Sequence, residues 1–141
     1  MALALILTAQ PLVPHYALAN PQQGTITHGS ASISGEGTAQ MTITQSSDRA
    51  VIEWDSFNVG SNERVDFHQP SSGSVTANKV TGADPSQILG QISATGKLLI
   101  INGNGVIFGA DSVIDAAAFI ASTHDISVSY THLTLPTTPY V

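Results

Sequence analysis

Residues 91–125 read QISATGKLLIINGNGVIFGADSVIDAAAFIASTHD, and apolar clusters recur in this stretch at a step of seven residues. Two triplets show the step: Ile100, Ile107 and Ile114, and Val106, Val113 and Ile120. A coiled coil has the same period, but Gly103, Gly105 and Gly109 fall inside the repeat. Each glycine in a helix costs about 1 kcal/mol relative to alanine, which excludes the coiled coil.

The remaining interpretation is a series of short β-branched strands that turn at glycine or asparagine, because these residues tolerate positive φ. Three sides of about seven residues make one coil of a parallel β-helix, in which each strand pairs with the next coil about 4.8 Å away. The sequence therefore predicts an all-β fold, a right-handed parallel β-helix. We expect the following residues in its core: Trp54, Phe57, Val106, Phe108, Val113 and Ile120.

Two segments before this repeat, residues 24–34 and 39–45, alternate apolar with small polar residues and predict half-exposed strands. The Glu36-Gly37 pair between them is a turn candidate, and paired strands at this position would cap the first coil. Further along, Asp84 followed by Pro85 is a typical helix start, which predicts one short helical turn over residues 84–90.

The motifs of the chain resemble a known family. Residues 101–109 (INGNGVIFG) and 119–127 (FIASTHDIS) resemble the secretion domain of filamentous-haemagglutinin-type exoproteins of the two-partner secretion pathway. Residues 51–60 resemble that family's Trp-x-x-Phe-Asn strand, and residues 65–70 and 78–82 resemble the two segments that follow it. The family usually has Asn-Pro-Asn-Gly where this chain has Asn102-Gly103-Asn104-Gly105.

The resemblance implies a non-enzymatic secretion domain of a large adhesin- or haemagglutinin-like exoprotein. Its implied partners are the Sec export machinery and a TpsB-type outer-membrane transporter with a periplasmic POTRA region. The implied location is outside a Gram-negative bacterium or on its surface, reached through the periplasm. The resemblance does not distinguish an adhesin from a haemolysin or a contact-dependent toxin, and a host-cell receptor would belong to the parent protein.

Two roles remain open for the motif Asn102, Gly103, Asn104 and Gly105. From the residues alone it is a β-helix corner, in which side-chain amides bond backbone groups that the turn leaves unpaired. From the resemblance it contributes to recognition by the transporter. The two roles are compatible, because a corner that shapes the domain also shapes its surface.

The two ends of the chain depart from the repeat. Residues 1–19 predict a signal peptide, because residues 2–13 are largely apolar yet too short to span a bilayer, and Ala17 and Ala19 form a small-x-small cleavage site. No Lys or Arg precedes the apolar run. A buried N-terminal helix is the alternative, but it must accommodate Pro11 and Pro14. Residues 128–141 break the pattern and resemble a translated sequencing adapter, which leaves residues 20–127 as a partial secretion domain.

The composition of the chain argues against a disulfide-stabilised fold and against a nucleic-acid-binding function. The 141 residues include no Cys, only 10% are charged, and the formal net charge is −6. Stability must therefore come from stacked coils rather than disulfides. The four basic residues are scattered, which argues against a nucleic-acid partner, since phosphate binding depends on clustered Lys and Arg.

The residues give little support for an enzyme, a metal site or a cofactor. The five histidines are isolated, so zinc-ligand pairs are missing. Ser122, His124 and Asp125 are the residue types of a hydrolase triad, but near neighbours in one strand point different ways. The remaining alternative is a polysaccharide lyase built on a β-helix, which requires Asp, Arg or Lys clustered on one face of successive coils.

Overall fold

The computed structural model describes residues 19–124. Within that range the chain forms twelve strands and no helix, and each strand is three to six residues long. The strands are β1 (Thr25–His28), β2 (Ala31–Ser34), β3 (Gln40–Gln45), β4 (Arg49–Trp54), β5 (Arg64–His68), β6 (Val75–Val80), β7 (Ser86–Ile88), β8 (Gln91–Ala94), β9 (Lys97–Asn102), β10 (Val106–Phe108), β11 (Val113–Asp115) and β12 (Ala118–Ser122).

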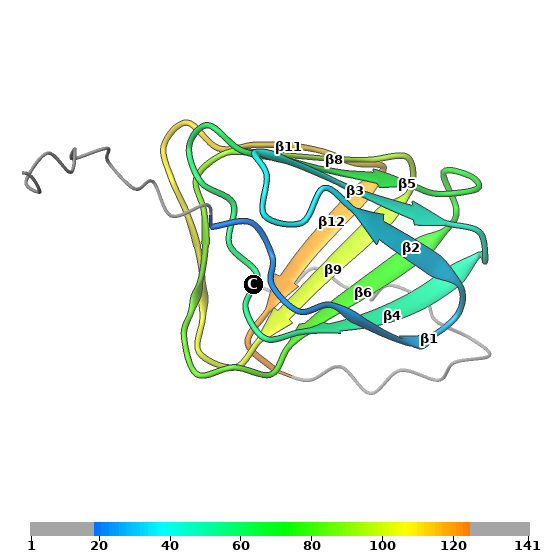
Figure 1. Ribbon diagram of the computed structural model, residues 1–141, viewed down its shortest axis with the longest axis horizontal. Coiled ribbons are helices and arrows are strands. Elements are labelled where there is room, and N and C mark those ends of the chain that lie inside the picture. Colours follow the sequence, from blue (N-terminus) through cyan, green and yellow to red (C-terminus); the bar gives the residue numbers. More distant parts are fainter. Residues whose placement is uncertain (1–18, 125–141) are drawn as a thin grey trace, which may run out of the picture.

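The strands form three sheets that enclose one core (Figure 1). Their orders are β1-β4-β6-β9-β12, β11-β8-β5-β3-β2 and β10-β7. From β3 onward every pairing is parallel and joins a strand to its counterpart one coil later. The molecule is therefore a parallel β-solenoid, as its sequence predicts.

The last coil has the predicted length. Along its three sides Ser86 pairs with Val106, Gln91 with Val113, and Lys97 with Ala118. These partners are 20, 22 and 21 positions apart by subtraction of their residue numbers. Each side therefore averages about seven residues, but the lengths differ enough to shift which residues face inward.

Antiparallel strands close the first coil, as expected of a cap. β1 pairs with β4 and β2 pairs with β3. The predicted strand over residues 24–34 is two strands in different sheets, because the chain crosses from one sheet to the other at Gly29, where φ is +80°. A Cβ on Gly29 would lie 2.2 Å from the Arg49 carbonyl oxygen, so only glycine fits this crossing.

One local prediction is wrong. Residues 86–88 form β7 rather than a helical turn, because parallel pairing with β10 takes up the backbone groups that a helix would have used. The Ser86 N–H donates to the Gly105 carbonyl at 2.9 Å. Tertiary pairing overrides the local Asp-Pro signal here.

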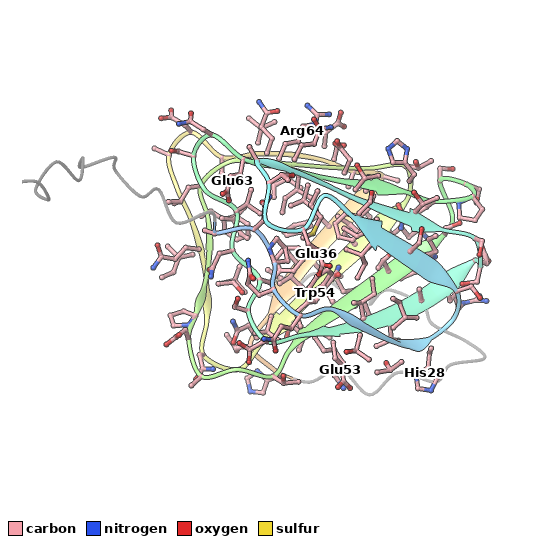
Figure 2. The ribbon with its side chains drawn as sticks, viewed as in Figure 1. His28, Glu36, Glu53, Trp54, Glu63 and Arg64 are labelled. Atoms are coloured by element: carbon pink, nitrogen blue, oxygen red, sulfur yellow. The ribbon has the colours of Figure 1, made fainter. Side chains whose placement is uncertain are left out.

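The core is an apolar stack inside the solenoid. Trp54 is fully buried and Phe57 is 1% exposed, and their rings meet edge to face with centroids 5.7 Å apart. Figure 2 shows Trp54 pointing into the space that the sheets enclose. Ten further buried side chains complete this cluster: Met41, Ile43, Ile52, Val59, Val65, Phe67, Ile88, Ile92, Leu98 and Ile100.

Two of the predicted core residues are exposed. Val113 is 51% exposed, because it is in register with the exposed Gln91, so Ile114 faces the core instead. Phe108 is in register with the buried Ile88 and contacts Phe119 edge to face, yet it is 43% exposed. Within residues 19–124 no strand stacks beyond β10 to cover it.

The other two are half-buried, in different places. Val106 packs against the main core. Ile120 is in register with Leu99 and packs into a second, smaller cluster with Val51, Val75 and Ala77. Because side chains alternate along a strand, this cluster lies on the outer face of the sheet whose inner face carries Leu98 and Ile100. The prediction that Ile120 faces the core is therefore wrong by one residue, because Ile120 lies on the outer face of its sheet.

Candidate functional site

The motif predicted from the sequence forms a tight corner between β9 and β10. Asn102 is the last residue of β9, and the Gly105 N–H donates to its carbonyl at 3.0 Å, which closes a four-residue turn. Gly105 has φ of +110°, a conformation that side-chain-bearing residues rarely adopt. The final glycine is therefore required by the backbone.

Asn102 points into the protein. It is fully buried, and its Nδ2 donates to the Asp84 carbonyl and to the Ser86 Oγ, both at 3.0 Å. Its Oδ1 accepts the Asn104 N–H at 2.9 Å. The side chain thus connects its own turn to the loop that leads into β7, one coil earlier.

Asn104 and Gly103 lie on the outside of the same corner. Asn104 is exposed, and its Nδ2 donates to the Gly82 carbonyl at 3.0 Å. Gly103 is also exposed and borders a surface depression of about 440 Å³, together with Glu53, Lys79 and Ile101. The motif therefore has a buried half that holds two coils together and an exposed half that a partner can reach.

Equivalent corners of earlier coils stack beneath this one. The Thr81 N–H donates to the Trp54 carbonyl at 2.8 Å. A Cβ on Gly82 would lie 2.1 Å from the Asp55 carbonyl oxygen, so these two turns are in direct contact. The corners of three successive coils thus form one column along the solenoid.

Two residues that support this column were not singled out from the sequence. Buried Asn78 accepts from the Trp54 Nε1 at 2.9 Å, and its Nδ2 donates to the Leu99 carbonyl at 3.2 Å. Ser86 is buried and accepts from Asn102. A buried tryptophan needs an acceptor for its N–H. Strand β6 (VTANKV) mixes polar and apolar residues, so its pattern alone does not single out Asn78 as that acceptor.

A carboxylate network lies on another outer face, away from the corner. The Asp66 side chain accepts from Arg64 Nε at 2.7 Å and from Gln40 Nε2 at 3.0 Å, and also from Ser93. Burial raises the pKa of Asp66, but the hydrogen bonds from Ser93, Arg64 and Gln40 outweigh it and hold the pKa below its usual value of 3.8. Figure 2 shows Arg64 on the outside of the solenoid.

The residues of the hydrolase-like triplet do not assemble into a catalytic arrangement. The Ser122 Oγ bonds the backbone of His124, donating to its carbonyl at 2.9 Å and accepting its N–H at 3.0 Å. The His124 ring instead lies 3.3 Å from the Thr123 Oγ1, and Asp125 lies outside the described residues. Over residues 19–124 no group of three or more His, Cys, Asp or Glu residues is placed to hold a metal ion. In the same range no helix could cross a membrane.

Comparison with known proteins identifies the family to which these features belong. The pattern that defines the TPS secretion domain matches residues 17–136. The chain belongs to the TPS secretion domain family. This domain is 41% identical over 106 residues to a heme/hemopexin-binding protein of Haemophilus influenzae and 39% identical to a second protein of that name. Each alignment covers 75% of this chain.

A solved structure has the same fold. The HMW1 secretion domain from Haemophilus influenzae superposes with a TM-score of 0.72 at 37% identity, over 77% of this chain. This TPS secretion domain spans 28% of the HMW1 chain and 11–12% of the two curated relatives. The family is a secretion domain rather than a catalytic one, and its members are exoproteins of two-partner secretion.

Proposed function

We propose that this chain is the N-terminal secretion domain of a large adhesin- or haemagglutinin-like exoprotein and has no enzymatic activity of its own. The chain is exported by Sec and loses residues 1–19. In the periplasm it engages the POTRA region of a cognate TpsB-type transporter and passes to the surface of a Gram-negative bacterium. The heme/hemopexin binding named for the relatives belongs to much longer proteins, so we assign only secretion to the matched region.

The observation that carries this proposal is the exposed half of the corner. Gly103 and Asn104 lie at the surface, while Asn102 fixes the turn from inside. A recognition element held by a rigid scaffold loses little conformational freedom on binding. The corner therefore combines accessibility with preorganisation, as a docking motif requires.

Strand edges supply a second element of the mechanism. Strand β12 lies at the edge of its sheet, and β9 is its one neighbour among the described strands. Its sequence, AFIAS, carries no charge and is apolar apart from Ser122. An extended segment of a partner can add to such an edge by backbone hydrogen bonds. We propose that the transporter uses this edge while the domain is partly unfolded, and that stacking of later coils outside the cell favours outward movement.

The experiment measures secretion and thermal unfolding together, in the parent exoprotein co-expressed with its transporter. Asn104→Ala removes an exposed hydrogen bond worth about 0.5–1.5 kcal/mol, and we expect secretion to fall more than this loss explains. Asn78→Ala is the matched control, because it removes a buried asparagine away from the surface. Its secretion should follow its folded fraction.

Gly103→Pro restores the residue that the family usually has, and we expect secretion to be retained. Gly103 is outside the left-handed region, and a Cβ there would come no closer than 3.9 Å to the Thr123 carbonyl oxygen. Proline is also favoured at the second position of a β-turn. If secretion simply tracks stability across all the variants, the recognition role is wrong and the corner is structural alone.

A further inference from the structure

Glu63 is a buried carboxylate with no cation beside it in the described part of the chain. The residue is 7% exposed, and its Oε1 accepts the Gly60 N–H at 2.7 Å. Its Oε2 accepts the N–H of Ala19 at 2.8 Å. The ion pairs recorded for residues 19–124 involve other carboxylates, those of Asp48 and Asp66. Glutamate is almost never buried unless paired, so this site calls for a positive charge.

The segment that Glu63 holds is docked firmly on the first coil. Asn20 is fully buried, and its Nδ2 donates to the Thr38 carbonyl. Two residues on, the Gln22 N–H donates to the Ser56 carbonyl at 2.9 Å. Figure 2 shows Glu63 on the side of the solenoid where the described chain begins. The Ala19–Asn20 peptide bond is thus part of the folded structure rather than of an open linker.

A second observation at this place also asks for a donor. The Oδ1 of Asn20 is buried and accepts no hydrogen bond from the described residues. Buried polar atoms are rarely left unsatisfied, because the lost hydration is not replaced. The two backbone N–H groups that reach Glu63, those of Gly60 and Ala19, are neutral and donate to its carboxylate oxygens. A group with more donors and a positive charge would satisfy both the carboxylate and the orphaned amide oxygen.

We propose that Glu63 and the Asn20 Oδ1 are the receptor for the α-ammonium of the processed chain. This inference rests on cleavage after Ala19 in the proposed function. Hydrolysis adds water across the Ala19–Asn20 bond: hydroxyl goes to the Ala19 carbonyl carbon, hydrogen goes to the Asn20 nitrogen, and that nitrogen takes up a proton at neutral pH. The resulting ammonium has three donors, and its nitrogen belongs to the residue next in the chain to Ala19, whose N–H Glu63 binds.

Signal removal and folding are then linked. A folded precursor hides the scissile bond, because Asn20 is fully buried, so cleavage precedes folding. The precursor also offers Glu63 only a neutral amide, whereas the mature chain offers a charge. Charge-assisted hydrogen bonds are roughly twice as strong as neutral ones, so the mature chain gains stability that the precursor lacks.

The test compares residues 20–141 bearing a free α-amine with the same chain acetylated enzymatically at that amine. Both are also made with Glu63→Gln, which keeps an acceptor for the Gly60 N–H but removes the charge. We expect acetylation to lower the folding equilibrium constant about tenfold in the unsubstituted chain, as measured by urea unfolding, and to change it little in the Glu63→Gln chain.

A second readout is the rate at which an amine-selective reagent acylates the α-amine of the folded chain, which should be slower with Glu63 than with Gln at this position. If the Glu63→Gln chain does not fold, the comparison of the free and acetylated chains with Glu63 is sufficient. Equal stability of these two chains would contradict the proposal that Glu63 binds the α-ammonium. N-terminal sequencing of exported protein separates the two proposals: a start other than Asn20 contradicts the processing step and leaves the stability comparison valid.

Discussion

Asn102 and Asn104 lie two residues apart and face opposite environments, so their contributions are physically separable. The buried Asn102 amide donates to the Asp84 carbonyl and the Ser86 hydroxyl and accepts the Asn104 N–H. The Asn104 side chain stays exposed, and its Nδ2 donates to the Gly82 carbonyl at 3.0 Å and, at the longer distance of 3.4 Å, to the Asn102 Oδ1. A substitution at the first site changes folding, and one at the second changes the surface.

Two phenylalanines give a direct test of the core assignment. Phe57 is 1% exposed, and Phe57→Ala should reduce the free energy of unfolding by about 3–5 kcal/mol, the range for a buried phenylalanine. Phe108 is 43% exposed, so Phe108→Ala should cost only about 1–2 kcal/mol, chiefly from lost contact with Phe119. Urea unfolding of both variants measures the difference. Equal losses would mean that the end of the solenoid is covered in solution.

The lowered pKa of Asp66 predicts that the free energy of unfolding falls at acidic pH. Because its folded pKa lies below 3.8, its contribution is fully present above that pH and is lost as the pH falls through the folded value. Asp66→Asn should therefore flatten the decline in the free energy of unfolding as the pH falls below about 4. Asp115→Asn, an exposed aspartate on β11, is the control. An unchanged acid profile in the Asp66→Asn chain would contradict the network.

At the scale of strands, the sequence predicts the repeat better than the register. The seven-residue step gives strands, glycine corners and a coil of about 21 residues, and all three are present. The predicted register fails at Val113 because this residue pairs with Gln91, 22 rather than 21 positions earlier, and a shift of one residue turns a side chain to the other face. Coil length is set by loops between the strands, where hydrophobic periodicity carries no information.

The contact between stacked corners predicts that alanine substitutions at two glycines, Gly82 and Gly73, change the stability of the protein by very different amounts. Gly82→Ala forces a Cβ to 2.1 Å from the Asp55 carbonyl oxygen and should destabilise by about 1–3 kcal/mol as the corner column shifts. Gly73→Ala is the control: its Cβ would come no closer than 3.8 Å to the Ser71 hydroxyl, so the change should stay within about 0.5 kcal/mol. Thermal unfolding of the two variants suffices, and a tolerated Gly82→Ala would show that the column is loose.

At the scale of the whole molecule, the interior contains hydrogen-bonded polar side chains as well as the apolar core. Buried Thr76 donates to Gln45 and accepts from Gln69 Nε2 at 2.9 Å, so a polar network continues beside the apolar stack. Single-strand patterns cannot reveal these bonds. Gln45 lies 31 positions from Thr76 and meets it only when coils stack, and Gln69 lies seven positions from Thr76, across the turn between β5 and β6. The corner motif was visible because its chemistry is local, whereas Asn78 and Glu63 acquire roles only through distant partners.

A solenoid whose coils contact only their neighbours should open from its less covered end. β4, β6 and β9 have a hydrogen-bonded strand on both sides, whereas β10, β11 and β12 have one described neighbour each and carry the exposed Phe108, Ile107 and Val113. We expect backbone amides of β4, β6 and β9 to exchange with solvent slowest and those of β10 and β11 fastest, because local opening exposes few buried contacts there. Native-state hydrogen exchange by NMR or mass spectrometry measures this, with rates from the urea-unfolded chain as the intrinsic reference. Uniform protection from β4 to β12 would mean that all coils open together, which would contradict opening from the less covered end.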